Sequence, residues 1–211
     1  MSPATLLHLL DYAGVAVFGV SGALVAGRKS LDLLGVVVIG IVTAIGGGTL
    51  RDLLLDRTVF WITDPGYLVT IIVASLLTVV YTRFRRPPDK ALQFADALGL
   101  ALFAIAGAQI AESSGAGDLI AVVMGTITGV FGGVLRDILC AEIPMILRKG
   151  NIYATAAIAG CSVYVVLQDA DIARAWAAGS GMLVIVTLRL AAIIWNLSLP
   201  VFSLTEPTDR R

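Results

Sequence analysis

The chain has 211 residues, of which 58% are hydrophobic and only 14% are charged, and its mean hydropathy is +0.92. Soluble domains carry roughly 25% charged residues, so this composition indicates a protein whose solvent is lipid. The formal net charge is zero, which gives no reason to expect a nucleic-acid partner.

Seven segments are apolar over the roughly 20 residues that a membrane-spanning helix needs. They predict an all-α integral membrane protein, with one transmembrane domain over residues 1–211 and no separate soluble domain. The predicted helices cover residues 5–27, 33–56, 66–83, 91–112, 118–140, 151–168 and 176–198.

Basic residues gather on one side of these helices. The linkers after the first, third and fifth helices, with the C-terminal tail, hold Arg28, Lys29, Arg83, Arg85, Arg86, Lys90, Arg148, Lys149, Arg210 and Arg211. Outside the repeated motifs described below, the other side holds only Arg57 and Arg174. Because cytoplasmic loops are enriched in Lys and Arg, we predict a multi-pass inner (plasma) membrane protein with its N-terminus outside and its C-terminus in the cytoplasm. The stretch RFRRPPDK (83–90) is interpreted as a cytoplasmic anchor, with contact to anionic lipid as the alternative.

The sequence repeats itself after a shift of 85 residues, without a gap, from residue 9 to residue 54. The matched positions include Asp11/Asp96, Phe18/Phe103, Gly22/Gly107, Gly40/Gly125, Thr43/Thr128, Gly47/Gly132, Gly48/Gly133, Arg51/Arg136 and Asp52/Asp137. Chance similarity between apolar helices would not keep charged residues and glycines in register. Each copy, 5–83 and 91–168, holds three helices. Because three is odd, the second copy enters from the opposite side, which predicts a 3+3 inverted repeat with a seventh helix (176–198) outside it.

Glycine clusters interrupt the second and fifth predicted helices, in AIGGGTLRDLLLD (44–56) and GVFGGVLRDILC (129–140). Each glycine weakens a helix by roughly 1 kcal/mol relative to Ala, so these clusters predict a kink or local unwinding. Backbone groups freed in this way must face protein or water. We therefore expect a narrow polar waist near the membrane midplane at Gly46, Gly47, Gly48, Gly132 and Gly133. Close helix packing is the alternative, and we favour it for GVSGALVAG (19–27) in the first helix.

An Arg-Asp pair follows each glycine cluster, namely Arg51-Asp52 and Arg136-Asp137. A charge inside the membrane faces a cavity or a partner by default. Adjacent residues on a regular helix point about 100° apart, so the two members of a pair need not bind each other. The inversion predicts two charged collars, one on each side of the glycines. The alternative is that the arginines reach out to the lipid headgroups.

Four further polar residues recur in the repeat. Thr43 and Thr128 precede the glycines by one turn, and they either line the waist or hydrogen-bond to a carbonyl one turn earlier. Asp11 and Asp96 lie near the start of the first and fourth helices. The helix dipole stabilises a carboxylate there, so we interpret both as caps.

Residues for catalysis are scarce. His8 is the only histidine, and Cys140 and Cys161 lie in apolar surroundings, where buried or lipid-facing thiols are expected. The sequence contains no Ser/His/Asp, Cys/His, metal-ligand or Walker-type arrangement. We therefore expect no enzyme activity, no cofactor and no metal site.

The phrases GGGTLRDLLL and GGVLRDIL, repeated at this distance in a seven-helix chain, resemble the prokaryotic members of the trimeric intracellular cation (TRIC) channels. The resemblance covers roughly residues 5–200. It implies a homotrimer with one ion pathway inside each protomer, bent second and fifth helices, and permeation of monovalent cations, K⁺ and Na⁺ included. By matching motif, the five glycines named above form the waist, and Arg51, Asp52, Arg136 and Asp137 are the associated charges.

Two function classes remain open from the residues alone, since inverted repeats suit both a channel and a transporter. Related bacterial chains have been described as putative glycine transporters, so a small-solute transporter working by alternating access is the alternative. The resemblance favours the channel. Arginine repels cations and no TVGYG filter is present, so we expect modest selectivity and arginines that act as gates or structural pairs.

Overall fold

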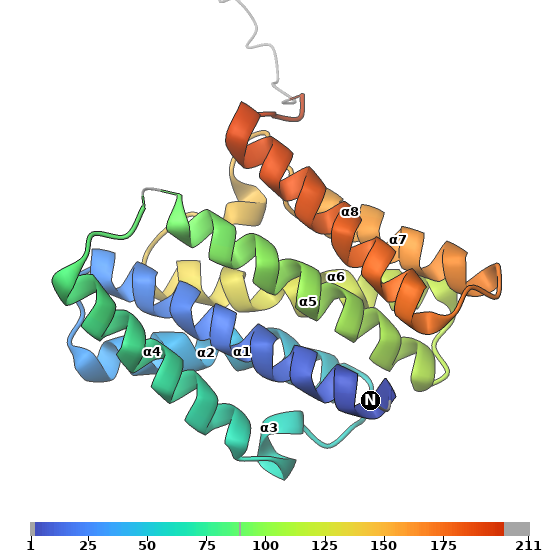
Figure 1. Cartoon of the computed structure of the whole chain (residues 1–211), viewed down its shortest axis with the longest axis horizontal. Helices are drawn as coiled ribbons and strands as arrows, with labels where there is room; N and C mark the ends of the chain where they lie inside the picture. Colours follow the sequence, from blue (N-terminus) through green and yellow to red (C-terminus); the bar gives the residue numbers. More distant parts are fainter. Residues whose placement is uncertain (1–2, 89, 201–211) are drawn as a thin grey trace, which may run out of the picture.

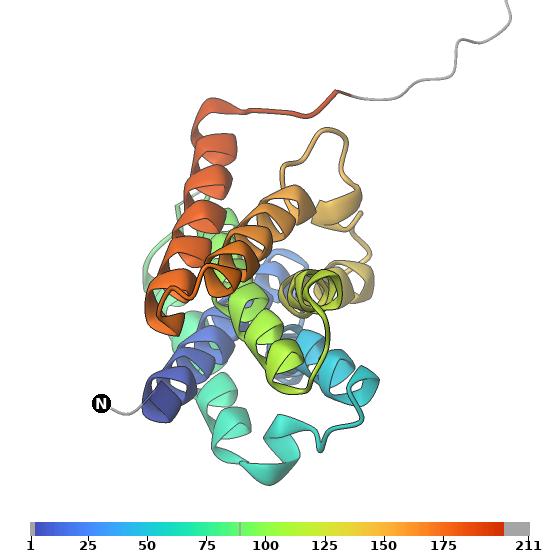
Figure 2. The same ribbon diagram turned by 90° about the vertical axis from the view of Figure 1, so that its right-hand side faces the viewer.

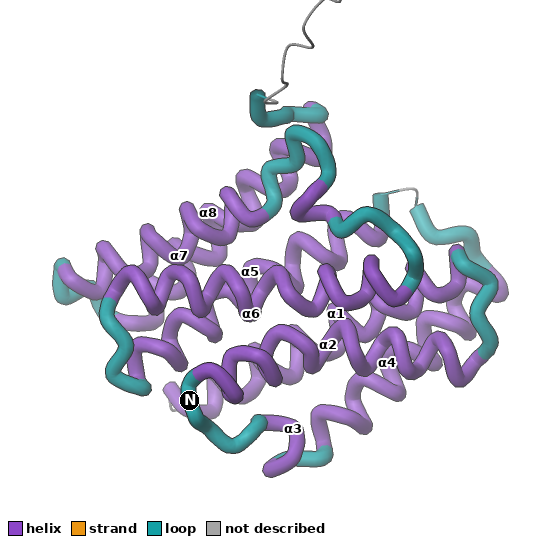
Figure 3. The backbone as a smooth tube through the Cα atoms, turned by 180° about the vertical axis from the view of Figure 1, so that it is seen from behind, coloured by secondary structure: helices purple, strands orange, loops and turns teal. Residues whose placement is uncertain are grey.

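The computed structural model describes residues 3–88 and 90–200, and within them the chain is helical apart from linkers and one isolated β-bridge. Figure 1 shows the helices and Figure 3 shows the loops that join them. The elements are α1 (Pro3–Arg28), α2 (Leu33–Leu54), the short α3 (Phe60–Thr63), α4 (Gly66–Phe84), α5 (Ala91–Ser113), α6 (Asp118–Leu139), the 3₁₀ helix η1 (Met145–Leu147), α7 (Ala154–Asp169) and α8 (Arg174–Trp195).

Six of the described helices are long and apolar enough to cross a membrane, namely α1 from His8 onward, α2, α4, α5, α6 and α8. They confirm six of the seven predicted segments. The seventh, α7, lies where it was predicted but has only 16 residues. At 1.5 Å per residue it extends about 24 Å, which is less than the roughly 30 Å of a hydrocarbon core. A seventh complete span therefore stays a prediction.

The basic linkers lie at one end of the bundle, on the left and upper side of Figure 1. Lys29, after α1, forms an ion pair with Glu142, after α6. Lys90, before α5, donates to the carbonyl of Ile193 near the end of α8, at 2.6 Å. These contacts join the linkers that the charge pattern assigned to one side of the membrane.

Helix α5 is the centre of the packing. It contacts α1, α6, α7 and α8, and Figure 2 shows α7 and α8 lying beside it. Small side chains make this possible, because alanines and glycines recur along α5 and let neighbouring helices approach closely. Helices α2 and α6 pack against each other as well, and their contact brings the two glycine motifs together.

The 85-residue spacing continues beyond the stretch where the sequences match. Helices α2 and α6 end 85 residues apart, and so do α4 and α7. Asp56 and Ala141 follow α2 and α6 with φ angles of 51° and 53°. The next amides, those of Arg57 and Glu142, each bond at 2.8 Å to a carbonyl five residues earlier, which ends both helices in the same way.

Candidate functional site

Helices α2 and α6 touch backbone to backbone at their glycines. A Cβ atom on Gly47 would lie 2.0 Å from the carbonyl oxygen of Thr128, and one on Gly132 would lie 2.1 Å from that of Thr43. Both helices run through these glycines without interruption. The local unwinding that we expected is therefore wrong, and close packing is what the glycines provide here. The reason is that each glycine retains its helical geometry while a neighbouring backbone occupies the space of a side chain.

The remaining glycines of the predicted waist also face packed groups. A Cβ on Gly46 would lie 2.6 Å from a methyl group of Leu135, and one on Gly48 would lie 2.6 Å from the Phe60 ring. At Gly133 it would lie 3.0 Å from the hydroxyl of Tyr153. All five glycines of the predicted waist thus face packed protein atoms.

The two threonines hydrogen-bond back along their own helices. Thr43 donates to the Ile39 carbonyl and Thr128 to the Met124 carbonyl, both at 2.6 Å. The hydrogen bond to a carbonyl one turn earlier is thus present in both copies, and the lining of a waist by the threonines stays a prediction. Their hydroxyl oxygens also fill the space where a Cβ on Gly22 or Gly107 would lie, at 2.8 and 2.5 Å. The predicted packing role in the first helix is confirmed for Gly19 and Gly22, whereas a Cβ on Gly27 would have nothing within 4 Å.

Each arginine of the repeated motif binds the aspartate that follows it. The Nε and Nη2 atoms of Arg51 both lie 2.8 Å from Oδ1 of Asp52, and those of Arg136 lie 2.8 Å from Oδ1 of Asp137. The two side chains leave the helix in different directions, but the long arginine side chain folds back and reaches the carboxylate of the aspartate. Arg51 is 3% exposed and Arg136 is fully buried, so the alternative of headgroup contact is wrong.

The second oxygen of each aspartate holds one of the short helices that the sequence did not predict. Asp52 Oδ2 accepts from the Phe60 amide at 3.0 Å, and Asp137 Oδ2 accepts from the Met145 amide at 2.9 Å. These amides begin α3 and η1, where helical N–H groups have no partner within the helix. Phe60 and Met145 are again 85 residues apart, and that spacing is the signal by which they could have been found.

The half of the site around Arg136 contains one additional ion pair. Arg136 Nη1 donates to Asp96 Oδ1 at 2.7 Å and also to the hydroxyl of Ser21. Asp96 lies on the second turn of α5 and is fully buried, so its interpretation as a cap is wrong. Ser21 was not identified from the sequence, and its counterpart in the second copy is Ala106. The second copy therefore offers no equivalent hydroxyl to Arg51, the arginine of the first copy.

The half of the site around Arg51 is open instead. A cavity of about 460 Å³ is lined by Asp11, Arg51, Asp52, Arg57, Thr58, Phe60, Thr63 and Ile110. Asp11 lies inside α1, not at its start, so it does not cap that helix either. Its carboxylate has no hydrogen-bond or ion-pair partner among the described residues. The two arginines thus lie on opposite sides of the glycine crossing, Arg51 beside a cavity and Arg136 sealed.

Cys140 and Cys161 are free and buried, as expected. Over residues 3–88 and 90–200 no group of three or more His, Cys, Asp or Glu side chains is placed to hold a metal ion. The sequence reasoning missed Arg189, a buried arginine on α8. Its signal was a single charge inside an otherwise apolar helix.

Known proteins resemble this chain over nearly its whole length. A family model described as "Glycine transporter" matches residues 8–83 and 93–169. The UPF0126 inner membrane protein YadS of Escherichia coli K12 is 50% identical over 204 residues, which cover 95% of this chain and 98% of that protein. Two solved structures are similar in both sequence and fold. The TRIC trimeric intracellular cation channel orthologue from Rhodobacter sphaeroides is 43% identical with a TM-score of 0.87, covering 92% of this chain and 100% of that one. A prokaryotic TRIC channel in 0.5 M KCl is 32% identical with a TM-score of 0.86, covering 93% and 100%.

Proposed function

The chain belongs to the prokaryotic TRIC channel family, and on this basis we propose that it conducts monovalent cations, K⁺ and Na⁺ included, across an inner membrane. We propose one pathway within each protomer of a homotrimer. The observation that carries this proposal is the pair of buried Arg-Asp contacts on either side of the α2–α6 crossing. Ionised groups inside a membrane bundle are costly and mark ion or substrate pathways.

The pathway proposed here follows the contact between α2 and α6. Cations enter the outer cavity, where Asp11 and Asp52 offset the charge of Arg51. They then pass the glycines and threonines named in the sequence analysis and leave beside Arg136. Because a backbone contact closes the crossing in this structure, conduction requires α2 and α6 to bend or separate there. A bend at the glycines therefore stays part of the proposal.

Arg136 serves as the inner gate in this scheme. Its guanidinium binds Asp96 and Asp137 and takes up space next to the crossing. Release from Asp96 would let the side chain move and would expose a carboxylate to passing cations. Among the described residues Arg51 has no second carboxylate partner, which agrees with its position beside an open cavity.

The two halves of the chain, 5–83 and 91–168, are proposed to be inverted repeats, with the helix at 176–198 outside them. The matched aspartate contacts to α3 and η1 support this, because they recur 85 residues apart. The end that carries the basic linkers is proposed to be cytoplasmic, which places the N-terminus outside.

A small-solute transporter is the second candidate, and the description of the matching family model favours it. A cavity open at one end and sealed at the other also suits alternating access. In that case the glycine crossing would be a hinge and the outer cavity a substrate site.

Recording from the purified protein in a planar bilayer with a KCl gradient tests the proposal. Discrete current steps that reverse near the K⁺ potential are expected, and replacing K⁺ by Na⁺ on one side would give the selectivity. A silent bilayer together with saturable glycine uptake into parallel liposomes would reject the channel in favour of the transporter.

A further inference from the structure

Arg189 is a buried cation without an anionic partner among residues 3–88 and 90–200. It lies on α8, six residues before the helix ends, and is 2% exposed. Its Nη1 donates to the Asn151 side chain at 2.9 Å and to the Ile152 carbonyl at 2.7 Å, and its guanidinium lies 4.8 Å from the centre of the Tyr153 ring. All of these groups are neutral. Its Nε atom has no hydrogen-bond partner among the described residues.

The burial of the Arg189 charge among neutral groups is energetically unfavourable. A buried charge is normally paired or otherwise compensated, and leaving one unpaired is strongly unfavourable. Arg136 shows the usual solution in the same bundle, with two carboxylates bound to it. The carboxylate of Asp96 acts on Arg189 only from a distance, since it is bound to Arg136 instead. Arg189 therefore lacks the counter-charge that its burial calls for.

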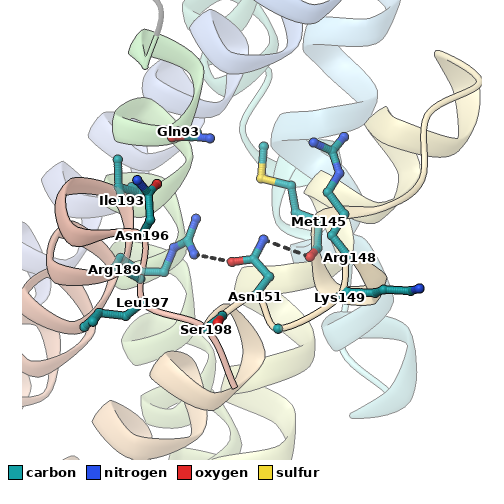
Figure 4. Close-up of a pocket in the computed structure, with 12 residues that line it drawn as sticks. Gln93, Met145, Arg148, Lys149, Asn151, Arg189, Ile193, Asn196, Leu197 and Ser198 are labelled. Carbon is teal, nitrogen blue, oxygen red and sulfur yellow. Dashed lines mark hydrogen bonds between the residues drawn. The ribbon is translucent and has the colours of Figure 1, made fainter. Parts of the chain in front are cut away.

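A cavity of about 240 Å³ opens beside this guanidinium, as Figure 4 shows. Arg148 and Lys149 line it as well, and none of the described lining residues is acidic. Gln93 and Ser198 contribute an amide and a hydroxyl that can donate hydrogen bonds. The volume is below the roughly 300–1,000 Å³ typical of pockets for drug-sized ligands, so it suits a small oxyanion or one phosphate group.

The cavity is built by two segments that are fastened together. Asn151 and Ser198 form an antiparallel bridge, and the Leu199 amide donates to the Gly150 carbonyl at 2.8 Å. These contacts hold the α6–α7 linker against the chain that follows α8. The carbonyls at the end of α8 would repel an anion, but Lys90 binds one of them and opposes that effect.

The basic side chains differ in how they meet the cavity. Figure 4 shows Arg189 directed at Asn151, whereas Lys149 points away from both. Arg148 Nε donates to the Ile143 carbonyl at 2.9 Å, and its Nη2 lies 3.7 Å from Glu142. Arg189 is thus the inner donor, and the other two bring positive charge to the mouth.

We propose that this cavity binds a phosphate group, with the Arg189 guanidinium as its inner donor and Arg148 and Lys149 at its mouth. The group comes from a phospholipid headgroup or from free phosphate. Arginine suits either source, because its planar guanidinium matches the geometry of phosphate oxygens. The site is separate from the α2–α6 crossing, so it stands whether the protein proves to be a channel or a transporter.

Thermal unfolding of the purified protein in a neutral detergent, followed by tryptophan fluorescence, tests this site. One arm adds inorganic phosphate against chloride at constant ionic strength. The other adds phosphatidylglycerol against phosphatidylcholine in mixed micelles. Stabilisation by phosphatidylglycerol alone assigns the site to a headgroup, and stabilisation by both anions assigns it to phosphate as such. If neither anion raises the midpoint, the proposal is overturned.

Substitutions make the test specific. Arg189→Gln is expected to weaken binding about tenfold or more, since it removes a charged donor. Arg174→Gln, the same change at the exposed first residue of α8, serves as the matched control and should bind normally. If Arg189→Gln does not fold, the exposed double variant Arg148→Gln/Lys149→Gln should show the weaker binding instead. Unchanged affinity in the variants that fold, or an equal loss in Arg174→Gln, would overturn the assignment.

Discussion

Replacing Asp96 by Asn tests whether the buried contact with Arg136 holds the inner gate shut. The change keeps the size of the side chain and removes its charge. In the structure Asp96 Oδ1 lies 2.7 Å from Arg136 Nη1, and both side chains are fully buried. Asn can still accept a hydrogen bond through its carbonyl oxygen, so the substitution removes the ionic part of the contact and leaves its shape.

The magnitude follows from the strength of one charged hydrogen bond. Such a bond contributes about 1.5–3 kcal/mol net, and Arg136 keeps its contact with Asp137. If the Asp96 contact exists only in the closed state, losing it raises the open-to-closed ratio by roughly 10- to 150-fold, because about 1.4 kcal/mol corresponds to a factor of ten. The lower part of this range is expected, since the asparagine carbonyl retains part of the bond.

Single-channel recording in planar bilayers measures this ratio directly as open probability. Asp11→Asn is the matched control, because it makes the same change at the equivalent position of the first copy. Its carboxylate lines the outer cavity without a partner among the described residues, so the control should lower single-channel conductance and leave open probability near the wild-type value. The gating role of Asp96 is refuted if Asp96→Asn leaves open probability unchanged, or if both variants change it equally.

Three further predictions follow from the same structure. Gly47→Ala should lower the free energy of unfolding of the purified protein by about 1–3 kcal/mol or more, because the added Cβ would meet a backbone carbonyl. A Cβ added at Gly179 would have no atom within 4 Å, so the control Gly179→Ala should be neutral or stabilising. Arg51→Ala and Arg136→Ala should each alter open probability, and unchanged conductance and gating in both would reject a gating role for these arginines. The pKa of Glu142 is held below its usual value near 4.5 by the hydrogen bond from its lysine partner. That contact therefore stabilises the fold above this pH, and its contribution is lost as the pH falls through the lowered pKa. The difference in unfolding midpoint between wild type and Glu142→Gln should be present at pH 7 and vanish in acid. A difference that persists in acid would contradict the reasoning.

The pairing of charges illustrates where sequence reasoning stopped. The sequence placed Arg136 and Asp137 inside a helix, but it did not indicate that Ser21 and Asp96 would meet the same guanidinium. Those residues come from α1 and α5, far from Arg136 along the chain. The contact of Ser21 and Asp96 with Arg136 forms only when three helices pack together, so a hydropathy pattern does not predict it.

The role of the glycines and the presence of the short helices also could not be predicted from the sequence. A glycine weakens a helix and also admits a close neighbour, and the sequence does not say which property is used. At Gly47 the glycine admits a close neighbour, because the carbonyl of Thr128 occupies the space of a side chain. Likewise α3 and η1 have little apolar periodicity of their own, and they form where Asp52 and Asp137 accept their first amides.

By itself, the sequence determined the membrane class, the positions of six spanning helices, the basic end of the bundle and the 85-residue repeat. These properties add up residue by residue, since each side chain brings its own transfer free energy and charge wherever it lies. Only the tertiary structure decided that the helices stay intact at the glycines, that one arginine is sealed while its counterpart faces a cavity, and that Arg189 is buried without an anion. Each of these depends on which atoms of distant segments come within a few ångströms, and that is a property of packing, not of composition.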